Sequence, residues 1–320
     1  MVSKIVVAAP SDTLSMVADL APKGFDVVTT AVGSPECRAA LADADYLVGF
    51  VDGMVDEKLY RGAPKLRLIQ LLSAGYDRAD MAAVRKAGIP MSNNGGANSV
   101  AVSEHALLLM LAVSRRVIRQ HANVIGGRWR GNEPPRVHEL RNRVLGIVGF
   151  GTIGKKTARL AQAFGMTVHY YDIARLREDQ EDALGVRFRL LPEILRGSDI
   201  VSLHVPLNPT TTHLIGADEL ALMKPSAVIV NTSRGPVIDE KALIAALSAG
   251  KLFGAGLDVF DEEPPPADNP LFALNNVVLT AHLAGPTWES NVARLRNAFD
   301  NVQRVERGEA PLWVVPEMLA

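Results

Sequence analysis

The stretch "VLGIVGFGTIGKKTARLAQAFGMTVHYYD", residues 144–172, decides the fold. Its first residues form an apolar strand pattern that ends in three glycines with G-x-G-x-x-G spacing, namely Gly149, Gly151 and Gly154. A helical pattern and a second apolar strand follow, and Asp172 stands where that strand ends. The alternative interpretation, a tight strand-to-helix turn that binds no ligand, does not require an acidic residue at this position. The order therefore predicts a β-α-β unit that binds a dinucleotide.

Each glycine of this loop has a physical task in such a unit. Gly149 is expected to permit the tight turn, Gly151 to let the backbone approach a pyrophosphate, and Gly154 to let the helix pack close to the strand. The free N–H groups and the positive dipole end of that helix then attract the diphosphate.

Asp172 bears on the choice between NAD and NADP. Its carboxylate is expected to accept hydrogen bonds from both hydroxyls of the adenosine ribose, and its charge repels a 2′-phosphate. Arg175 and Arg177 follow closely and partly offset that repulsion. We expect NAD to be the cofactor, with NADP the less favoured alternative.

Along the chain as a whole, short apolar strands alternate with helix-length segments, which is typical of parallel sheets covered by helices. Two long helical patterns are expected at 99–120 and 287–308, and the second is followed by a strand-like tail, "PLWVV". The expected strands are 4–9, 26–30, 46–50, 66–72, 89–93, 143–151, 166–172, 199–206, 226–233, 252–260 and 276–282.

These patterns predict an α/β protein with two doubly wound parallel-sheet domains. The helix at 287–308 would carry the chain back onto the first domain. A Rossmann dinucleotide-binding domain, residues 99–287, would then be inserted into a flavodoxin-like substrate-binding domain, residues 1–98 plus 288–320.

The composition limits the functional classes. The 320 residues carry 34 Lys+Arg against 35 Asp+Glu, a net charge of −1, which offers no reason to expect nucleic acid or an anionic membrane as a partner. Cys37 is the only cysteine, so neither a disulfide nor a cysteine zinc cluster is expected, and no metal site is predicted. The longest apolar run, 106–113, is far shorter than a membrane span. We expect a soluble, cytoplasmic protein.

One segment has a local excess of positive charge. Two acidic residues, Glu133 and Glu139, accompany eight arginines there. A solvated or subunit-contact face is favoured over an anion site, because arginine also suits interface pairing. The arginines are Arg115, Arg116, Arg119, Arg128, Arg130, Arg136, Arg141 and Arg143.

Charged or titratable residues stand just past several predicted strands. They are Arg234 in "NTSRGP", Asp258 and Glu263 in "GLDVFDEEP", and His282 in "TAHLAGPT". The carboxyl ends of parallel strands meet at one edge of a sheet, where ligands bind. These residues therefore predict a convergent polar site.

The residue types fit hydride transfer on a 2-oxo or 2-hydroxy acid. Reduction of a ketone needs a proton besides the hydride, and a histidine such as His282 delivers one near neutral pH. A carboxylate behind the imidazole fixes its tautomer, and an arginine such as Arg234 clamps a substrate carboxylate. Spacing alone does not choose among Asp261, Glu262 and Glu263, and taken singly each residue also suits an ordinary surface loop.

Assembled, these stretches resemble the D-isomer-specific 2-hydroxyacid dehydrogenase family, which includes glyoxylate/hydroxypyruvate reductases and glycerate and phosphoglycerate dehydrogenases. The resemblance runs nearly end to end. It is carried by "LLSAGYDRAD" (71–80), "NSVAVSEHALLLML" (98–111), the glycine loop, "LHVPLNPTTTHLI" (203–215), "NTSRGPVIDEKALIAAL" (231–247), "GLDVFDEEP" (256–264) and "AHLAGPT" (281–287).

The resemblance implies that Arg234 orients the substrate and that Glu263 pairs with His282, the acid/base. Ala74 and Gly75 would donate backbone hydrogen bonds to the substrate carboxylate. The family also implies a homodimer formed through the cofactor domain. Among the implied cofactor contacts, Asp258 would hold the nicotinamide carboxamide; the others are Thr152, Ile153, Val205, Pro206, Thr232, Ser233 and Gly285.

An NAD-sensing scaffold, like the family's transcriptional corepressors, is the alternative function, because those proteins carry the same residue types. Formate or phosphite dehydrogenase activity is the third alternative for the function. The choice of 2-hydroxy acid depends on the width of the substrate pocket, which is expected to be set by residues 50–53, 73–76 and 285–289.

Overall fold

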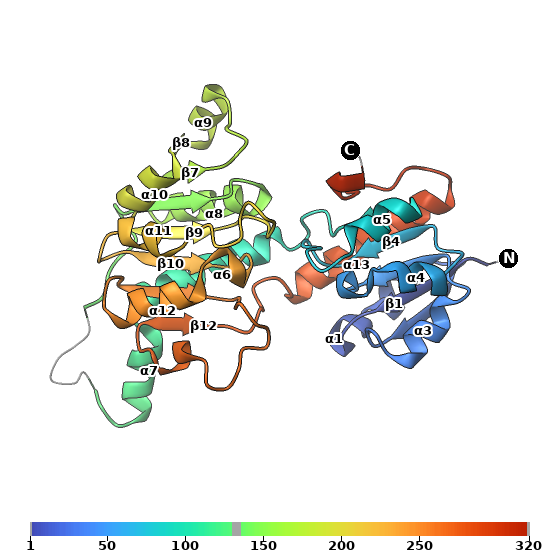
Figure 1. Cartoon of the computed structure of the whole chain (residues 1–320), viewed down its shortest axis with the longest axis horizontal. Coiled ribbons are helices and arrows are strands. Elements are labelled where there is room, and N and C mark those ends of the chain that lie inside the picture. The colour runs from blue at the N-terminus through green and yellow to red at the C-terminus, as the bar shows by residue number, and fades with distance from the viewer. Residues whose placement is uncertain (1, 130–135, 319–320) are drawn as a thin grey trace. The chain divides into compact units, whose positions relative to one another are not determined.

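The computed structural model describes residues 2–129 and 136–318 (Figure 1). Its contacts divide the chain into two compact units. Unit 1 consists of Met1–Asn98 and Pro286–Ala320, and unit 2 of Ser99–Gly285. Each unit contains one parallel sheet, so the predicted α/β class with two parallel sheets is confirmed. Within the described ranges, no helix is long and apolar enough to cross a membrane.

Unit 1 has a five-stranded sheet in the order β2-β1-β3-β4-β5, the flavodoxin-like doubly wound arrangement. Its strands are β1 (Lys4–Ala8), β2 (Asp26–Thr30), β3 (Tyr46–Gly49), β4 (Leu68–Leu71) and β5 (Met91–Ser92). Its helices are α1 (Ser11–Leu14), α2 (Val17–Leu20), α3 (Pro35–Leu41), α4 (Glu57–Gly62), α5 (Met81–Ala87) and α13 (Trp288–Glu306), with short 3₁₀ turns η1 (Asp52–Met54) and η4 (Pro316–Met318).

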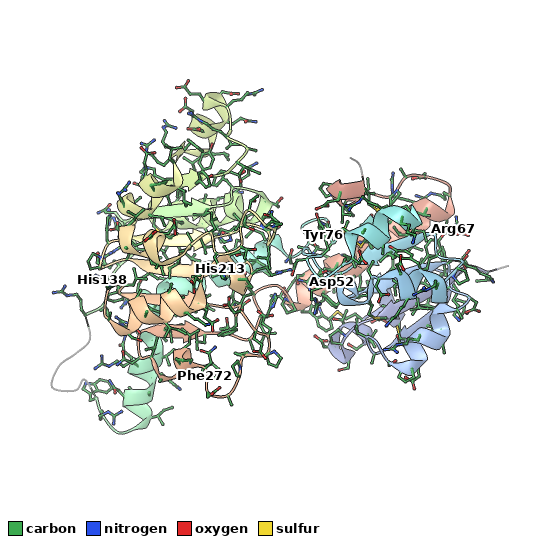
Figure 2. All side chains as sticks on the ribbon, viewed as in Figure 1. Asp52, Arg67, Tyr76, His138, His213 and Phe272 are labelled. Atoms are coloured by element: carbon green, nitrogen blue, oxygen red, sulfur yellow. The ribbon has the colours of Figure 1, made fainter. Side chains whose placement is uncertain are left out.

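Helix α13 belongs to unit 1 although nearly 200 residues of unit 2 precede it. Leu295, Phe299 and Val302 recur at helical spacing, and this apolar face is buried against the first strands of the sheet. Arg67, labelled in Figure 2, forms an ion pair of 2.6 Å with Glu306 at the end of the helix. The apolar stripe and this pair tie the C-terminal segment to the N-terminal sheet.

Unit 2 has a seven-stranded parallel sheet in the order β12-β11-β10-β9-β6-β7-β8. Its strands are β6 (Val144–Val148), β7 (Thr167–Tyr171), β8 (Val186–Phe188), β9 (Ile200–Leu203), β10 (Val228–Asn231), β11 (Gly254–Leu257) and β12 (Val277–Leu279). Its helices are α6 (Ser99–Ser114), α7 (Val117–Ile125), α8 (Thr152–Ala163), α9 (Glu178–Leu184), α10 (Leu191–Gly197), α11 (Ala217–Leu222) and α12 (Glu240–Ser248), with η2 (Gly235–Val237) and η3 (Pro270–Ala273).

In unit 2, strands β6, β7 and β8 lie side by side in chain order, and the next strand, β9, pairs with the other edge of β6. The strand order therefore reverses between β6 and β9. This is the Rossmann order, and ligands of such sheets bind outside the carboxyl ends of the strands at the reversal point. The glycine loop follows β6 directly and therefore lies at that point.

The structure corrects three local expectations. Strand β8 was missed, because "VRF" is too short to form an apolar run. The helix predicted at 99–120 is in fact two helices, which are separated at Arg116. The backbone of Arg116 is left-handed (φ 53°), and its guanidinium donates a hydrogen bond to the carbonyl of Phe253. The tail "PLWVV" forms only an isolated antiparallel bridge between Val314 and Ser92.

Candidate active site

The glycine loop is shaped by close backbone contacts. Gly149 has a left-handed backbone (φ 92°), and a Cβ there would lie 2.6 Å from the carbonyl group of His204. A Cβ at Gly154 would lie 2.3 Å from the Gly149 oxygen, whereas a Cβ at Gly151 would meet nothing within 4 Å. Gly149 and Gly154 thus bring β6, β9 and α8 together, and Gly151 leaves space in front of the backbone.

Asp172 is held beside this loop. Its Oδ2 atom accepts the Phe150 N–H at 2.6 Å, and its Oδ1 atom accepts the Ala174 N–H at 2.9 Å. The two neighbouring arginines are engaged with acids of their own: Arg175 with Glu181 and Arg177 with Asp179. Both pairs offset the positive charge near Asp172.

The first turn of α8 and two further loops stand at the same sheet edge. Thr152 is exposed and Ile153 is half-buried at the start of α8, whose N-cap, Gly151, provides no side-chain acceptor. The loops after β9 and β10 carry the other expected cofactor contacts, which are Val205, Pro206, Thr232 and Ser233.

Two buried polar atoms at this edge have no hydrogen-bond partner among the described residues: Nδ1 of His204 and Oγ1 of Thr232. Buried polar atoms in proteins are nearly always paired, so an external polar group is expected there. Together with the open space at Gly151 and the Asp172 carboxylate, these atoms fit a dinucleotide.

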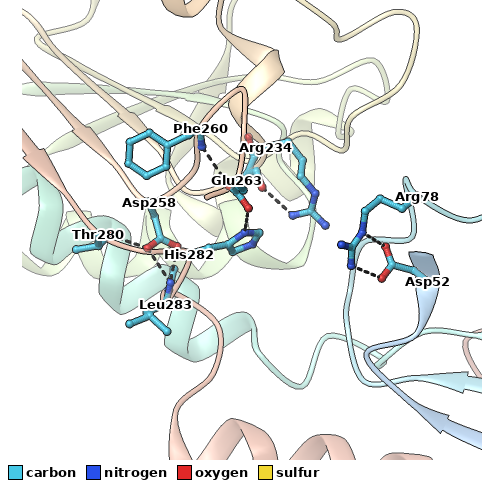
Figure 3. Close-up of polar contacts among 11 residues, drawn as sticks. Asp52, Arg78, Arg234, Asp258, Phe260, Glu263, Thr280, His282 and Leu283 are labelled. Carbon is cyan, nitrogen blue, oxygen red and sulfur yellow. Dashed lines mark hydrogen bonds and ion pairs between the residues drawn. The ribbon is translucent and has the colours of Figure 1, made fainter. Parts of the chain in front are cut away.

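His282 and Glu263 form a short hydrogen bond. His282 Nδ1 lies 2.6 Å from Glu263 Oε2, and the Phe260 N–H donates to Glu263 Oε1 at 3.1 Å (Figure 3). Partial burial alone would raise the pKa of Glu263, but the bond to His282, the Phe260 N–H and the charge of Arg234 lower it overall. Of the three acidic residues in this loop, Glu263 is therefore the one that contacts His282, and its lowered pKa favours the charged carboxylate.

Asp258 holds the loop that carries His282. Its carboxylate is buried and accepts hydrogen bonds from the Thr280 hydroxyl at 2.6 Å and from the N–H groups of Leu283 and Ala284 at 2.9 Å. Its own carbonyl accepts the His282 N–H at 2.8 Å. His282 adopts a left-handed backbone (φ 53°), a conformation that costs a non-glycine residue energy and needs such support.

Arg234 approaches the same place from the end of β10. Asn231 shapes its turn, because its side chain donates to the Arg234 carbonyl and accepts the Ser233 N–H. A Cβ at Gly235 would lie 1.9 Å from the Phe260 carbonyl, so only glycine lets the two loops pass this closely. As a result, the side chains of Arg234, Glu263 and His282 gather in one place (Figure 3).

Asn231, Thr280 and His105 contribute hydrogen bonds at this site but were not predicted from the sequence. Asn231 had a signal, since a polar residue ends an apolar strand. His105 had none: its Nε2 atom lies 2.9 Å from the Thr280 hydroxyl, yet it comes from α6, 175 residues earlier. Gly285, an expected cofactor contact, is buried at the end of unit 2.

Ala74 and Gly75, the expected donors to the substrate carboxylate, lie in unit 1 just after β4. Their carbonyls accept hydrogen bonds from Asn93 Nδ2 and the Ser73 hydroxyl. Within the described residues, neither N–H has a hydrogen-bond acceptor. The loop therefore presents two donors that an anion can use.

The fold and this site define a class: a two-domain α/β oxidoreductase that uses a nicotinamide dinucleotide. Comparisons with known proteins give the family. Residues 107–284 match the sequence model of the D-isomer specific 2-hydroxyacid dehydrogenase, NAD binding domain. The glyoxylate reductase of Korarchaeum cryptofilum is 42% identical over 272 residues, which are 84% of this chain and 82% of the relative.

Two solved structures are similar over nearly the whole chain. A glyoxylate reductase from Paecilomyes thermophila superimposes with a TM-score of 0.85 at 31% identity, covering 99% of both chains. D-lactate dehydrogenase from Aquifex aeolicus, complexed with NAD and lactic acid, gives a TM-score of 0.84 at 29% identity, covering 95% of this chain and 96% of that one. The chain belongs to the D-isomer specific 2-hydroxyacid dehydrogenase family, and the predicted enzyme class, NAD-dependent D-2-hydroxyacid dehydrogenase, is confirmed.

Proposed function

We propose that the protein reduces a short 2-oxo acid, of the size of glyoxylate or hydroxypyruvate, to the D-2-hydroxy acid at the site formed by Arg234, Glu263 and His282. The observation that carries this proposal is the 2.6 Å contact between His282 and Glu263 beside Arg234. The names of the similar glyoxylate reductases support the size of the substrate.

NADH, when bound, supplies the hydride that goes to C2 of the 2-oxo acid. His282 supplies the proton: with Nδ1–H donating to Glu263, Nε2 is the atom that protonates the carbonyl oxygen. The carboxylate of Glu263 fixes this tautomer and stabilises the imidazolium. In the opposite direction, the neutral imidazole takes the hydroxyl proton of the D-2-hydroxy acid.

Arg234 orients the substrate. A guanidinium presents a planar fork of donors that matches a carboxylate, and its charge polarises the adjacent carbonyl. The backbone N–H groups of Ala74 and Gly75 are the proposed further donors to that carboxylate. Asp258 acts as a positioning residue, since its buried carboxylate holds the loop of His282; its contact with the nicotinamide carboxamide stays a prediction.

NAD is the proposed cofactor in preference to NADP. Asp172 is the residue that decides, because a carboxylate accepts ribose hydroxyls and repels a 2′-phosphate. The ion pairs of Arg175 and Arg177 with neighbouring acids leave little positive charge to counter that repulsion.

We further propose a homodimer formed through unit 2. Helices α6 and α7 and the residues after them expose large apolar side chains, and contiguous exposure of this kind marks interaction surfaces. Arg115 to Arg143 flank this face, with Arg130 outside the described residues. The exposed side chains are Val100, Leu108, Val117, Ile118, Val124, Ile125 and Trp129.

The test of the function is a panel of 2-oxo acids with NADH and NADPH in parallel, monitored by loss of nicotinamide absorbance. Turnover of glyoxylate or hydroxypyruvate with NADH is expected. Tight NADH binding without turnover on any 2-oxo acid would instead favour the NAD-sensing scaffold. Sedimentation analysis of the purified protein tests the dimer.

A further inference from the structure

His105, on α6, is a half-buried histidine that the proposed mechanism does not use. Its Nε2 atom lies 2.9 Å from the Thr280 hydroxyl oxygen and 3.6 Å from Asp258 Oδ1. The Thr280 hydroxyl in turn lies 2.6 Å from that same carboxylate oxygen (Figure 3). The three side chains therefore form one hydrogen-bonded chain, and all of them belong to unit 2.

The protons of this chain can be arranged in one direction only. A carboxylate accepts hydrogen bonds and donates none, so the single hydroxyl proton of Thr280 points to Asp258. The Thr280 oxygen then has only lone pairs left for His105, and Nε2 of that imidazole must carry a proton. The chain therefore runs from His105 through Thr280 to Asp258, and each bond polarises the next.

Close packing of α6 on β11 brings the helix within reach of this strand. A Cβ at Gly254 would lie 2.8 Å from Val113 Cγ1, and a Cβ at Gly256 would lie 2.8 Å from Leu109 Cβ. Because both glycines lack a side chain, the apolar face of the helix can lie directly against the strand.

The same register places His105 at the end of the strand. Four residues of helix span about 6 Å and two residues of strand about 6.7 Å, so the two repeats nearly match. The helical step from Leu109 to His105 therefore follows the strand from Gly256 to Asp258. The packing of α6 thus delivers an imidazole to the carboxyl end of β11, where the site lies.

The Asp258 carboxylate anchors the loop that carries His282. Besides the Thr280 hydroxyl, it accepts the N–H groups of Leu283 and Ala284, each at 2.9 Å. The torsion that turns an aspartate carboxylate is soft, and turning it would break these two bonds. The hydroxyl of Thr280, itself held by His105, opposes that rotation.

We propose that His105 is a positioning residue for the reaction. By donating through Thr280, it fixes the orientation of the Asp258 carboxylate. The fixed carboxylate holds the loop in which His282 adopts its left-handed backbone, and so keeps the imidazole in place for proton transfer. This inference rests on the proposed function and deepens it. His105 exchanges no proton with the substrate and acts on kcat through His282.

Removal of either donor in the chain tests the proposal by kinetics. His105→Leu and Thr280→Val remove the N–H and the hydroxyl, and each is expected to lower kcat with NADH and glyoxylate or hydroxypyruvate by about tenfold, with little change in KM. His105→Gln keeps an N–H donor and should retain most of the activity. The double variant His105→Leu/Thr280→Val should lose no more than the weaker single variant, because both changes break one chain.

Val113→Ala is the matched control for packing. It truncates a side chain on the same face of α6, at the opposite end of β11 from Asp258. Its melting temperature is expected to fall while its kcat stays unchanged. A fall in kcat equal to that of His105→Leu would overturn the proposal, because loss of helix packing would then explain the effect. Independent, multiplicative losses in the double variant would overturn it too.

Amide hydrogen exchange of residues 281–285, followed by mass spectrometry, gives a readout that needs no turnover. Exchange in this loop is expected to become about tenfold faster in His105→Leu and to stay unchanged in His105→Gln and Val113→Ala. Unchanged exchange in both His105→Leu and Thr280→Val would overturn the positioning role. Absence of turnover on every 2-oxo acid in the unmodified protein, with faster exchange in these two variants, would refute the proposed function instead.

Discussion

His282 Nδ1 and Glu263 Oε2 lie 2.6 Å apart, although 19 residues separate them in the chain. The two residues come from the loops after β12 and β11, which are adjacent parallel strands. Sheet register therefore sets their distance. The Phe260 N–H donates to the Glu263 side chain, and the Asp258 carbonyl accepts the backbone N–H of His282.

Replacing His282 by alanine should stop reduction while leaving cofactor binding intact. The imidazole is the only proposed proton donor, and positioned acid/base groups contribute about 10²- to 10⁴-fold to rate. We expect kcat with glyoxylate or hydroxypyruvate to fall by at least about 10²-fold. Fluorescence titration should give an unchanged NADH affinity; full turnover in the variant would contradict the assignment.

Glu263→Gln should shift the pH profile of reduction. The pKa of Glu263 is held below its usual range in the folded protein, so the carboxylate stays charged across the working pH and stabilises the imidazolium. An amide oxygen can still accept from His282 Nδ1–H without the charge, while the amide nitrogen then faces the Phe260 N–H, which is itself a donor. Since reduction needs the protonated imidazole, the alkaline fall of kcat/KM should move to lower pH in the variant. An unmoved profile would show that the charge of Glu263 does not assist proton transfer.

Gly235→Ala should damage both stability and activity. A Cβ at this position would lie 1.9 Å from the Phe260 carbonyl, so the loops carrying Arg234 and Glu263 must separate. Overpacking against backbone costs about 1–3 kcal/mol of unfolding free energy, measurable by urea denaturation. Gly197→Ala is the control, because a Cβ there meets nothing within 4 Å; equal stability of the two variants would contradict the close approach.

Asp172→Ala should weaken NADH binding and reduce discrimination against NADPH. Loss of a charged acceptor for ribose hydroxyls should raise the KM for NADH by about 10- to 100-fold, and loss of the repulsion should lower the KM for NADPH. Asp172→Asn keeps the acceptor for the Phe150 N–H and separates a loop distortion from the charge effect. Parallel kinetics with both cofactors measure the change.

The buried His204 should lower the free energy of unfolding at acidic pH. Burial lowers the pKa of His204 from its ordinary 6.5 to about 4. Between these two pH values the unfolded chain binds a proton that the folded protein does not, so the unfolding free energy falls as pH falls, by up to about 3 kcal/mol. Urea unfolding at pH 7, 6 and 5 should show a smaller fall for His204→Gln than for the unmodified protein or for His121→Gln, an exposed control on α7.

Much of unit 2 could be predicted from local pattern. The glycine spacing, the strand before it and Asp172 after it are short-range features, because a tight turn needs Gly149 and a close helix needs Gly154 whatever surrounds them. The charged residues just past the strand ends also indicated a site, because the carboxyl ends of parallel strands meet at one edge of a sheet. The sequence did not predict the short strand β8, because its formation depends on pairing with β7. It did not predict the helix break at Arg116, because that break depends on the contact with Phe253.

By itself, then, the sequence determined the α/β class, the dinucleotide loop and the residue types of the site, since these depend on neighbours within a few residues. Spacing alone did not choose among Asp261, Glu262 and Glu263; the family resemblance implied Glu263, and the tertiary structure brings it to His282. Only the tertiary structure joined His105 to Thr280. Such facts depend on sheet register and on packing between segments far apart in the chain, and no local pattern of residues encodes them.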